Sequence, residues 1–81
     1  MKQKIYIIDW VDSMSDTGWK HSSQLEQVEY PIARCQTIGF FVNETKEYIT
    51  LALNRDLIGG NCPYGDLISI PKVAIKRKKK L

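Results

Sequence analysis

Apolar side chains occur in short runs separated by polar segments, which is the pattern of a β-rich domain. Residues 4–11 (KIYIIDWV) carry β-branched and aromatic residues on both faces and predict a buried strand. Residues 34–42 and 47–53 alternate apolar side chains with a period of two, and residues 43–46 between them are polar. These segments predict an antiparallel hairpin with a tight turn. Gly39, inside the first of them, predicts a bulge or a sharp bend.

A long polar loop is expected between the first strand and this hairpin. Residues 12–31 are rich in serine, aspartate and glutamine, and they end at a proline. Ser23 and Glu26 have the spacing of a capping box, in which the serine would cap the helix and the glutamate would reach back. The loop therefore has room for a helix of about two turns before Pro31 ends it.

Two further strands are expected after the hairpin. Residues 54–65 are rich in glycine and predict a loop. Residues 66–70 predict a fourth strand that ends at Pro71, and residues 74–77 predict a short fifth strand after a single tight turn.

This succession of elements resembles the SH3-like small barrel. The features that carry the resemblance are the long first loop, the hairpin turn at 43–46 and the turn within residues 70–75, where SH3-like barrels place a 3-10 turn before the fifth strand. The resemblance implies a mainly β fold, namely a five-stranded, partly open SH3-like barrel. The chain lacks the acidic Ala-Leu-Tyr-Asp-Tyr opening and the paired tryptophans of true SH3 domains, so recognition of proline-rich peptides does not follow.

A second resemblance concerns short segments of the sequence. Several segments are similar to small uncharacterised proteins encoded by bacteriophages and prophages: residues 8–13, Gly18-Trp19, and residues 35–42, 49–53 and 70–72. This resemblance implies a bacterial cytosol and an accessory role during infection, and it specifies no activity.

Positive charge is concentrated at one end of the chain. Twelve Lys and Arg residues against nine Asp and Glu residues give a net charge of +3, and five of the basic residues are consecutive: Lys76, Arg77, Lys78, Lys79 and Lys80. The rest of the chain is mildly acidic. Because 81 residues have room for one domain only, we expect a single small β-barrel domain over residues 1–75 and a basic C-terminal tail over residues 76–81.

The basic tail is open to three interpretations. Consecutive cations can bind nucleic-acid phosphates with little sequence preference. They can also attract an acidic protein surface. Finally, they can form a solvated terminus that prevents edge-to-edge pairing of the last strand.

No membrane or secretion segment is expected. The chain has no run of about 18 apolar residues, and Asp9 interrupts the first apolar stretch, unlike the core of a signal peptide. We therefore expect a cytoplasmic protein, and the resemblance to phage-encoded proteins implies that the cell is a bacterial host. In that reducing compartment Cys35 and Cys62 are expected to be unpaired thiols, and a disulfide is the alternative for a secreted chain.

Candidate catalytic residues lack partners at a recognisable spacing. Asp9, Asp12 and Asp16 cluster after the first strand, where carboxylates can hold a divalent cation, but no further ligand accompanies them. His21 and the two cysteines do not reach the four ligands of a zinc site or the geometry of a Cys–His nucleophile. The Gly-Gly pair at 59–60 is not followed by the lysine of a phosphate-binding loop. We predict no enzymatic activity, no metal and no cofactor.

Aromatic residues form the candidate binding surface. Trp19 and Tyr30 bracket the first loop, and Tyr64 precedes the fourth strand. Because the resemblance to SH3-like barrels implies that these two loops face one groove, we expect Trp19, Tyr30 and Tyr64 to form an aromatic partner-binding groove. The alternative is that the tryptophans, Trp10 above all, fill a small core.

The sequence thus predicts a binding protein, with three hypotheses for its partner. The first is a phage-type accessory protein that binds a host or phage protein through the aromatic groove. The second is a nucleic-acid-binding small barrel that uses the basic tail and exposed aromatics. The third is a structural protein that forms a homo-oligomer through its exposed strand edges.

Overall fold

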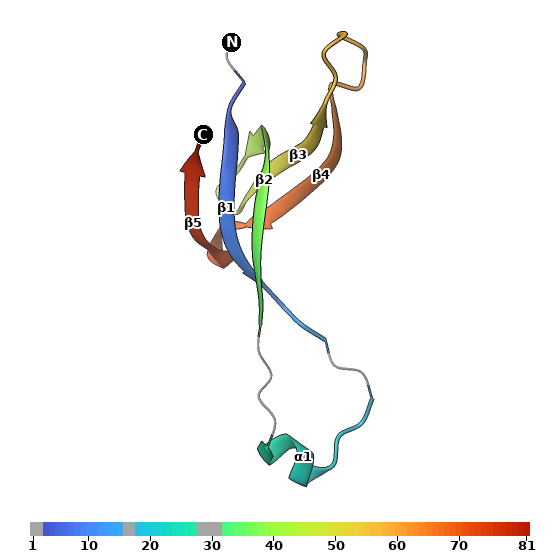
Figure 1. Ribbon diagram of the computed structural model, residues 1–81, viewed down its shortest axis with the longest axis vertical. Coiled ribbons are helices and arrows are strands. Elements are labelled where there is room, and N and C mark those ends of the chain that lie inside the picture. Colours follow the sequence, from blue (N-terminus) through green and yellow to red (C-terminus); the bar gives the residue numbers. More distant parts are fainter. Residues whose placement is uncertain (1–2, 16–17, 28–31) are drawn as a thin grey trace.

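The computed structural model describes residues 3–15, 18–27 and 32–81 and consists of one antiparallel sheet with one short helix. It confirms the mainly β fold, the five strands, the short helix in the first loop and the 3-10 turn before the last strand. In chain order the elements are β1 (Ile5–Asp12), α1 (Ser22–Gln27), β2 (Ala33–Glu44), β3 (Tyr48–Arg55), β4 (Tyr64–Pro71), η1 (Lys72–Ala74) and β5 (Ile75–Lys80) (Figure 1).

The strand order is β4-β3-β2-β1-β5, and all neighbours are antiparallel. β4 and β5 are the two edges of the described sheet and do not pair with each other, so the sheet is not closed and the expected barrel is not confirmed. Nevertheless, the three residues of η1 connect one edge to the other. The sheet must therefore coil until the end of β4 comes close to the start of β5, in the direction that strand twist favours.

Coiling gives the sheet a concave face, where the core lies. Alternate positions of β1, β3 and β4 supply the large side chains that are fully buried in the described part of the chain: Ile8, Ile49, Leu51 and Ile70. The register places Ile49 opposite Ile70, so these residues share one face. Around the four pack partly buried apolar side chains from β1, β2, β4 and β5: Tyr6, Trp10, Phe41, Ile68 and Ile75.

β2 bends where the sequence predicts it. The register between β2 and β3 shifts between Phe41 and Asn43, two residues after Gly39. At Gly39 the two strands approach so closely that a Cβ atom would lie 2.8 Å from the backbone oxygen of Ala52. Gly39 is therefore required by the close approach of two backbones, and the bulge beside it turns the second half of β2 around the core.

The helix begins one residue before the predicted capping box and uses a different cap. The backbone N–H groups of Gln24 and Leu25 donate to the carbonyl oxygen of His21, at 2.9 and 3.2 Å. The Gln24 side chain in turn accepts the His21 backbone N–H at 2.8 Å. The reciprocal pair is thus His21 and Gln24, and the predicted pair of Ser23 and Glu26 is wrong. A glutamine at the third helical position can accept the N–H of the capping residue as well as a glutamate can, so the helix begins earlier than the Ser-Glu spacing suggested.

Helix α1 lies away from the sheet, beyond one end of β1 and β2 (Figure 1). The molecule measures 57 × 24 × 20 Å, and its radius of gyration is 17.3 Å, against roughly 12 Å for a compact domain of this length. The described side chains of α1, residues 22–26, are all exposed. Stability therefore comes from the coiled sheet, without a contribution from burial of the helix.

We expect Gly39→Ala to destabilise the fold by about 1–3 kcal/mol, because the new methyl group would push the Ala52 carbonyl out of the ladder. Gly65→Ala is the matched control: its Cβ would lie 3.7 Å from the nearest atom, an ordinary contact, so a change within about 0.5 kcal/mol is expected. Urea denaturation of the two variants measures both values. Equal destabilisation would show that loss of glycine itself, and not the close approach at Gly39, causes the effect.

Candidate functional site

Strand β5 contains the five consecutive cations. The sequence places the end of the domain at residue 75, whereas the structure continues the strand to Lys80 and pairs it with β1. Lys80 lies opposite Tyr6, Lys78 opposite Ile8 and Arg77 opposite Asp9. Residues 76–80 are therefore part of the sheet and form its edge, because β1 offers β5 one complete side of hydrogen-bonding groups.

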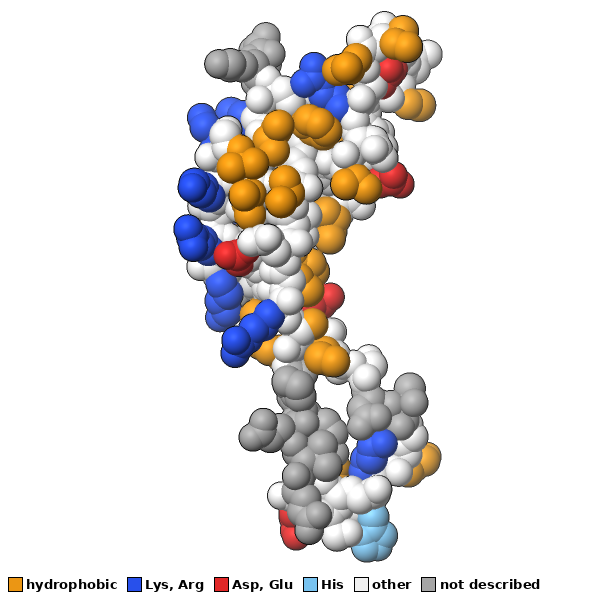
Figure 2. Space-filling view, in the orientation of Figure 1, with side chains coloured by type: hydrophobic (Ala, Val, Ile, Leu, Met, Phe, Trp, Pro, Cys, Tyr) orange, Lys and Arg blue, Asp and Glu red, His pale blue; other side chains and the backbone are white. Residues whose placement is uncertain are grey.

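The cations of this edge point to both faces of the sheet. Successive side chains of a strand alternate, so Lys78 and Lys80 share the concave face with Tyr6 and Ile8, and Arg77 and Lys79 share the opposite face with Asp9 and Ile7. Lys76 lies where the register between β1 and β5 shifts. We call residues 76–80 the basic edge. Figure 2 shows Lys and Arg side chains along the side of the molecule where Figure 1 places β5.

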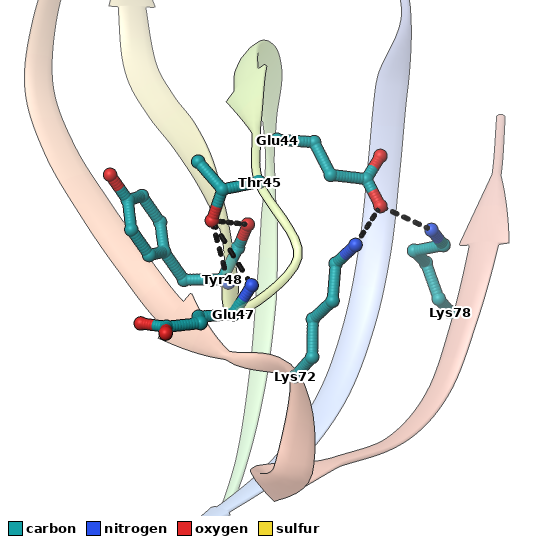
Figure 3. A network of polar contacts seen from close by, with 6 residues as sticks. All are labelled: Glu44, Thr45, Glu47, Tyr48, Lys72 and Lys78. Atoms are coloured by element: carbon teal, nitrogen blue, oxygen red, sulfur yellow. Dashed lines mark hydrogen bonds and ion pairs between the residues drawn. The ribbon is translucent and has the colours of Figure 1, made fainter.

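A carboxylate on β2 forms ion pairs with η1 and with the basic edge. The Glu44 carboxylate forms an ion pair with the ammonium of Lys72 in η1, at 2.7 Å, and its oxygen lies 3.7 Å from the Lys78 ammonium (Figure 3). The Lys72 hydrogen bond and the Lys78 charge hold the pKa of Glu44 below its ordinary value of 4.5, against an opposing effect of burial. The Lys78 ammonium also lies 5.5 Å from the centre of the Tyr6 ring.

The turn between β2 and β3 provides a second attachment for η1. The Thr45 hydroxyl accepts the backbone N–H groups of Glu47 and Tyr48, both at 3.1 Å, which fixes the turn (Figure 3). The carbonyl oxygen of Glu47 then accepts the backbone N–H of Lys72 at 2.8 Å. The hairpin thus binds both the backbone and the side chain of Lys72, and through it sets the position at which β5 begins.

The structure does not bring together the two described residues of the predicted aromatic groove, Trp19 and Tyr64. Trp19 is fully exposed in the connection between β1 and α1, whereas Tyr64 begins β4 at the opposite end of the molecule (Figure 1). Tyr64 is half-buried, and its hydroxyl donates to the Gln3 side chain at 2.7 Å. Tyr30 lies outside the described residues. Trp19 and Tyr64 do not share a surface, and binding by either residue alone stays a prediction.

Trp10 belongs to the core. It packs against the buried cluster, and its indole N–H donates to the Thr37 hydroxyl at 2.9 Å. Cys35 lies opposite Trp10 and is half-buried, whereas Cys62 is exposed in the connection between β3 and β4. Both thiols are free.

The carboxylates considered for metal binding have other partners. Asp9 accepts from the Gln36 side chain at 2.9 Å, and Asp12 accepts the backbone N–H of Ser13 at 2.8 Å. Asp16 lies outside the described residues. Within the described part of the chain no three His, Cys, Asp or Glu side chains gather in a way that could hold a metal ion.

The glycine-rich connection between β3 and β4 is organised by its own carboxylate. Asp56 accepts the backbone N–H groups of Ile58 and Gly60, both at 2.9 Å, and these bonds lower the pKa of Asp56. Two of the amides that a phosphate would need are therefore already occupied by a carboxylate, in agreement with a turn at the Gly-Gly pair.

An apolar groove of about 360 Å³ on β2, β3 and β4 was not anticipated from the sequence. Its lining includes the exposed side chains of Ile38, Leu53 and Leu67. At one end Asp66 has a φ of 56°, in the left-handed region, and accepts from the Asn54 amide at 2.6 Å. Alternation alone assigned these positions to strands but could not show that the fold leaves them uncovered.

The contacts of Glu44 were also missed by the sequence analysis. Glu44 belonged to the predicted polar turn, and its partners are 28 and 34 positions further along the chain. The available signal was an acid within a predicted hairpin turn, and it does not specify a partner.

Comparison with known proteins identifies no relative: no family model, no curated protein and no solved structure matches this chain. In the described residues, no helix has the length and apolar character needed to cross a membrane.

Glu44→Gln is expected to lower stability near pH 7 by less than about 1 kcal/mol, since both ion pairs are partly exposed and screened by solvent. Because the folded-state pKa of Glu44 is depressed, its contribution is present above pH 4.5 and is lost as pH falls through the folded value. Melting temperatures of wild type and variant should differ near pH 7 and converge in acid. Glu47→Gln, on the same turn, is the control. A difference that persists in acid would contradict the ion-pair explanation.

Removal of the two tryptophan side chains should change the stability of the protein to different extents. Trp10→Ala is expected to cost on the order of 2–3 kcal/mol, because it opens the core and leaves Thr37 without its donor. Trp19→Ala should change stability by no more than about 0.5 kcal/mol, since its side chain is fully exposed. Urea denaturation compares them. A large loss for Trp19→Ala would place that side chain in the core.

Proposed function

We propose that this protein is a small non-catalytic module that binds another protein through its basic edge. The observation that carries the proposal is that five consecutive cations lie on an edge strand of the sheet, with β1 on one side and no described strand on the other. Edge strands offer unpaired backbone groups, and partner proteins use such edges.

The distribution of the cations favours a protein over a nucleic acid. A nucleic-acid backbone that lies against one face of the sheet meets only the cations of that face, either Lys78 and Lys80 or Arg77 and Lys79. A protein segment that lies along the edge itself can contact the cations of both faces.

The architecture and origin are part of the same proposal. An SH3-like assignment is supported by the strand order, by a last strand that pairs with the first, and by the 3-10 turn before it. A phage-type accessory role in a bacterial cytosol is supported by the resemblance of the sequence segments alone. The partner would then be a host or phage protein.

Two other roles are open to the basic edge: prevention of pairing with other sheets, and formation of a homo-oligomer. Lysines on an edge strand prevent pairing with other sheets, and in that role they need no partner. A homo-oligomer through β5 would bring cations against cations, which is unfavourable.

Charge removal from the basic edge tests the proposal. We expect Arg77→Gln/Lys79→Gln and Lys78→Gln/Lys80→Gln each to abolish capture of a defined protein from nuclease-treated bacterial lysate, because the partner contacts both faces. Lys46→Gln/Arg55→Gln removes the same charge from exposed positions outside β5 and should leave capture intact. Thermal melts check that all three variants fold.

The alternatives predict other results. Recovery of nucleic acid alone, lost after nuclease and at raised salt, would replace protein binding by phosphate binding. Capture that survives both β5 variants would remove the basic edge from the binding surface. Concentration-dependent sedimentation would favour a homo-oligomer.

A further inference from the structure

We infer that the basic edge binds an acidic, extended segment of its partner as an additional antiparallel or parallel strand beside β5. The inference rests on the proposed function and specifies the chemistry of the partner. It follows from the direction of the backbone groups of β5, from the alternation of its cations and from the character of the other edges.

The backbone of β5 has free hydrogen-bonding positions at alternate residues. The N–H of Leu81 donates to the carbonyl oxygen of Ile5 at 2.8 Å, so the backbone N–H of Leu81 points toward β1. In an antiparallel ladder the backbone groups of alternate residues point toward the neighbouring strand, so those of Lys79 and Arg77 also point toward β1. The N–H and C=O groups of Lys78 and Lys80 then point away from β1, toward the side where the described chain places no strand.

The side chains of the basic edge specify the charge of an added strand. Residues directly opposite each other in a ladder share one face, with their Cβ atoms about 4.5–5.5 Å apart. An added strand therefore places one side chain beside Arg77 and Lys79 on one face and another beside Lys78 and Lys80 on the other. Consecutive acidic residues satisfy both faces, whereas an apolar strand would remove the ammonium groups from water without compensation.

The edges of a second copy do not provide this chemistry. Another β5 would repel the basic edge. The other free edge, β4 (Tyr64–Pro71), has one acidic residue, Asp66, and that carboxylate is held by Asn54. The complementary strand must therefore come from a different, acidic protein segment.

A pair of variants at Lys78 separates backbone from charge. Lys78→Ala removes the cation and keeps the N–H, whereas Lys78→Pro removes both. Because this N–H points away from β1, a proline is compatible with the edge strand. The probe is a fluorescent peptide of consecutive glutamates flanked by valines. We expect Lys78→Pro to bind it roughly five- to tenfold more weakly than Lys78→Ala, since one backbone hydrogen bond is lost.

A second measurement uses the unaltered protein, so that it does not depend on the folding of a variant. The same peptide with N-methyl groups at alternate glutamates keeps its charge but cannot pair in a ladder, and we expect its binding to fall by at least about tenfold. A single-stranded oligonucleotide serves as the comparison, because its binding does not use the Lys78 N–H.

Each outcome bears on the inference separately from the proposed function. Equal binding by Lys78→Ala and Lys78→Pro, together with no effect of N-methylation, would overturn strand addition while capture through the β5 charges still stands. No binding of the acidic peptide would also overturn it. Oligonucleotide binding that exceeds peptide binding and follows the β5 charges would assign the basic edge to nucleic acid. If capture from lysate is independent of the β5 charges, the proposed function itself fails.

Discussion

The structure depends on a connection of three residues between the two edges of one sheet. β4 and β5 lie at opposite ends of the strand order, and η1 (Lys72–Ala74) is the whole link between them. So short a link can be made only if the sheet coils. Lys72 secures it twice, through its backbone to the carbonyl of Glu47 and through its ammonium to Glu44.

Coiling also explains how a single sheet can have a core. The buried side chains gather on the concave face, while Ile38 and Leu67 on the outer surface stay largely exposed. Among the described residues four large side chains are fully buried, so the hydrophobic contribution is small, as expected for a chain of this length. Hydrogen bonds of the strand ladders consequently account for a larger share of the stability.

In the proposed function, the basic edge would combine protection with selectivity. A free strand edge can pair with any sheet that presents one, and a row of lysines discourages such pairing. The same charges favour one kind of strand, that which is acidic on both faces. Since β5 is fixed by Glu44 on the concave side and by its ladder with β1, its cations are presented in a defined geometry.

The sequence by itself determined the strands, the hairpin, the bend near Gly39 and the tight turn before the last strand, because these depend on alternation, glycine and proline within a few residues. It did not determine that β5 would pair with β1 as far as Lys80, that Glu44 would meet Lys72 and Lys78, or that Trp19 and Tyr64 would lie at opposite ends. Those features are long-range. Local pattern decides which residues become strands, whereas only the packing of the whole sheet decides which strands are neighbours. For that reason residues 76–80, predicted as a tail, became the edge strand of the sheet.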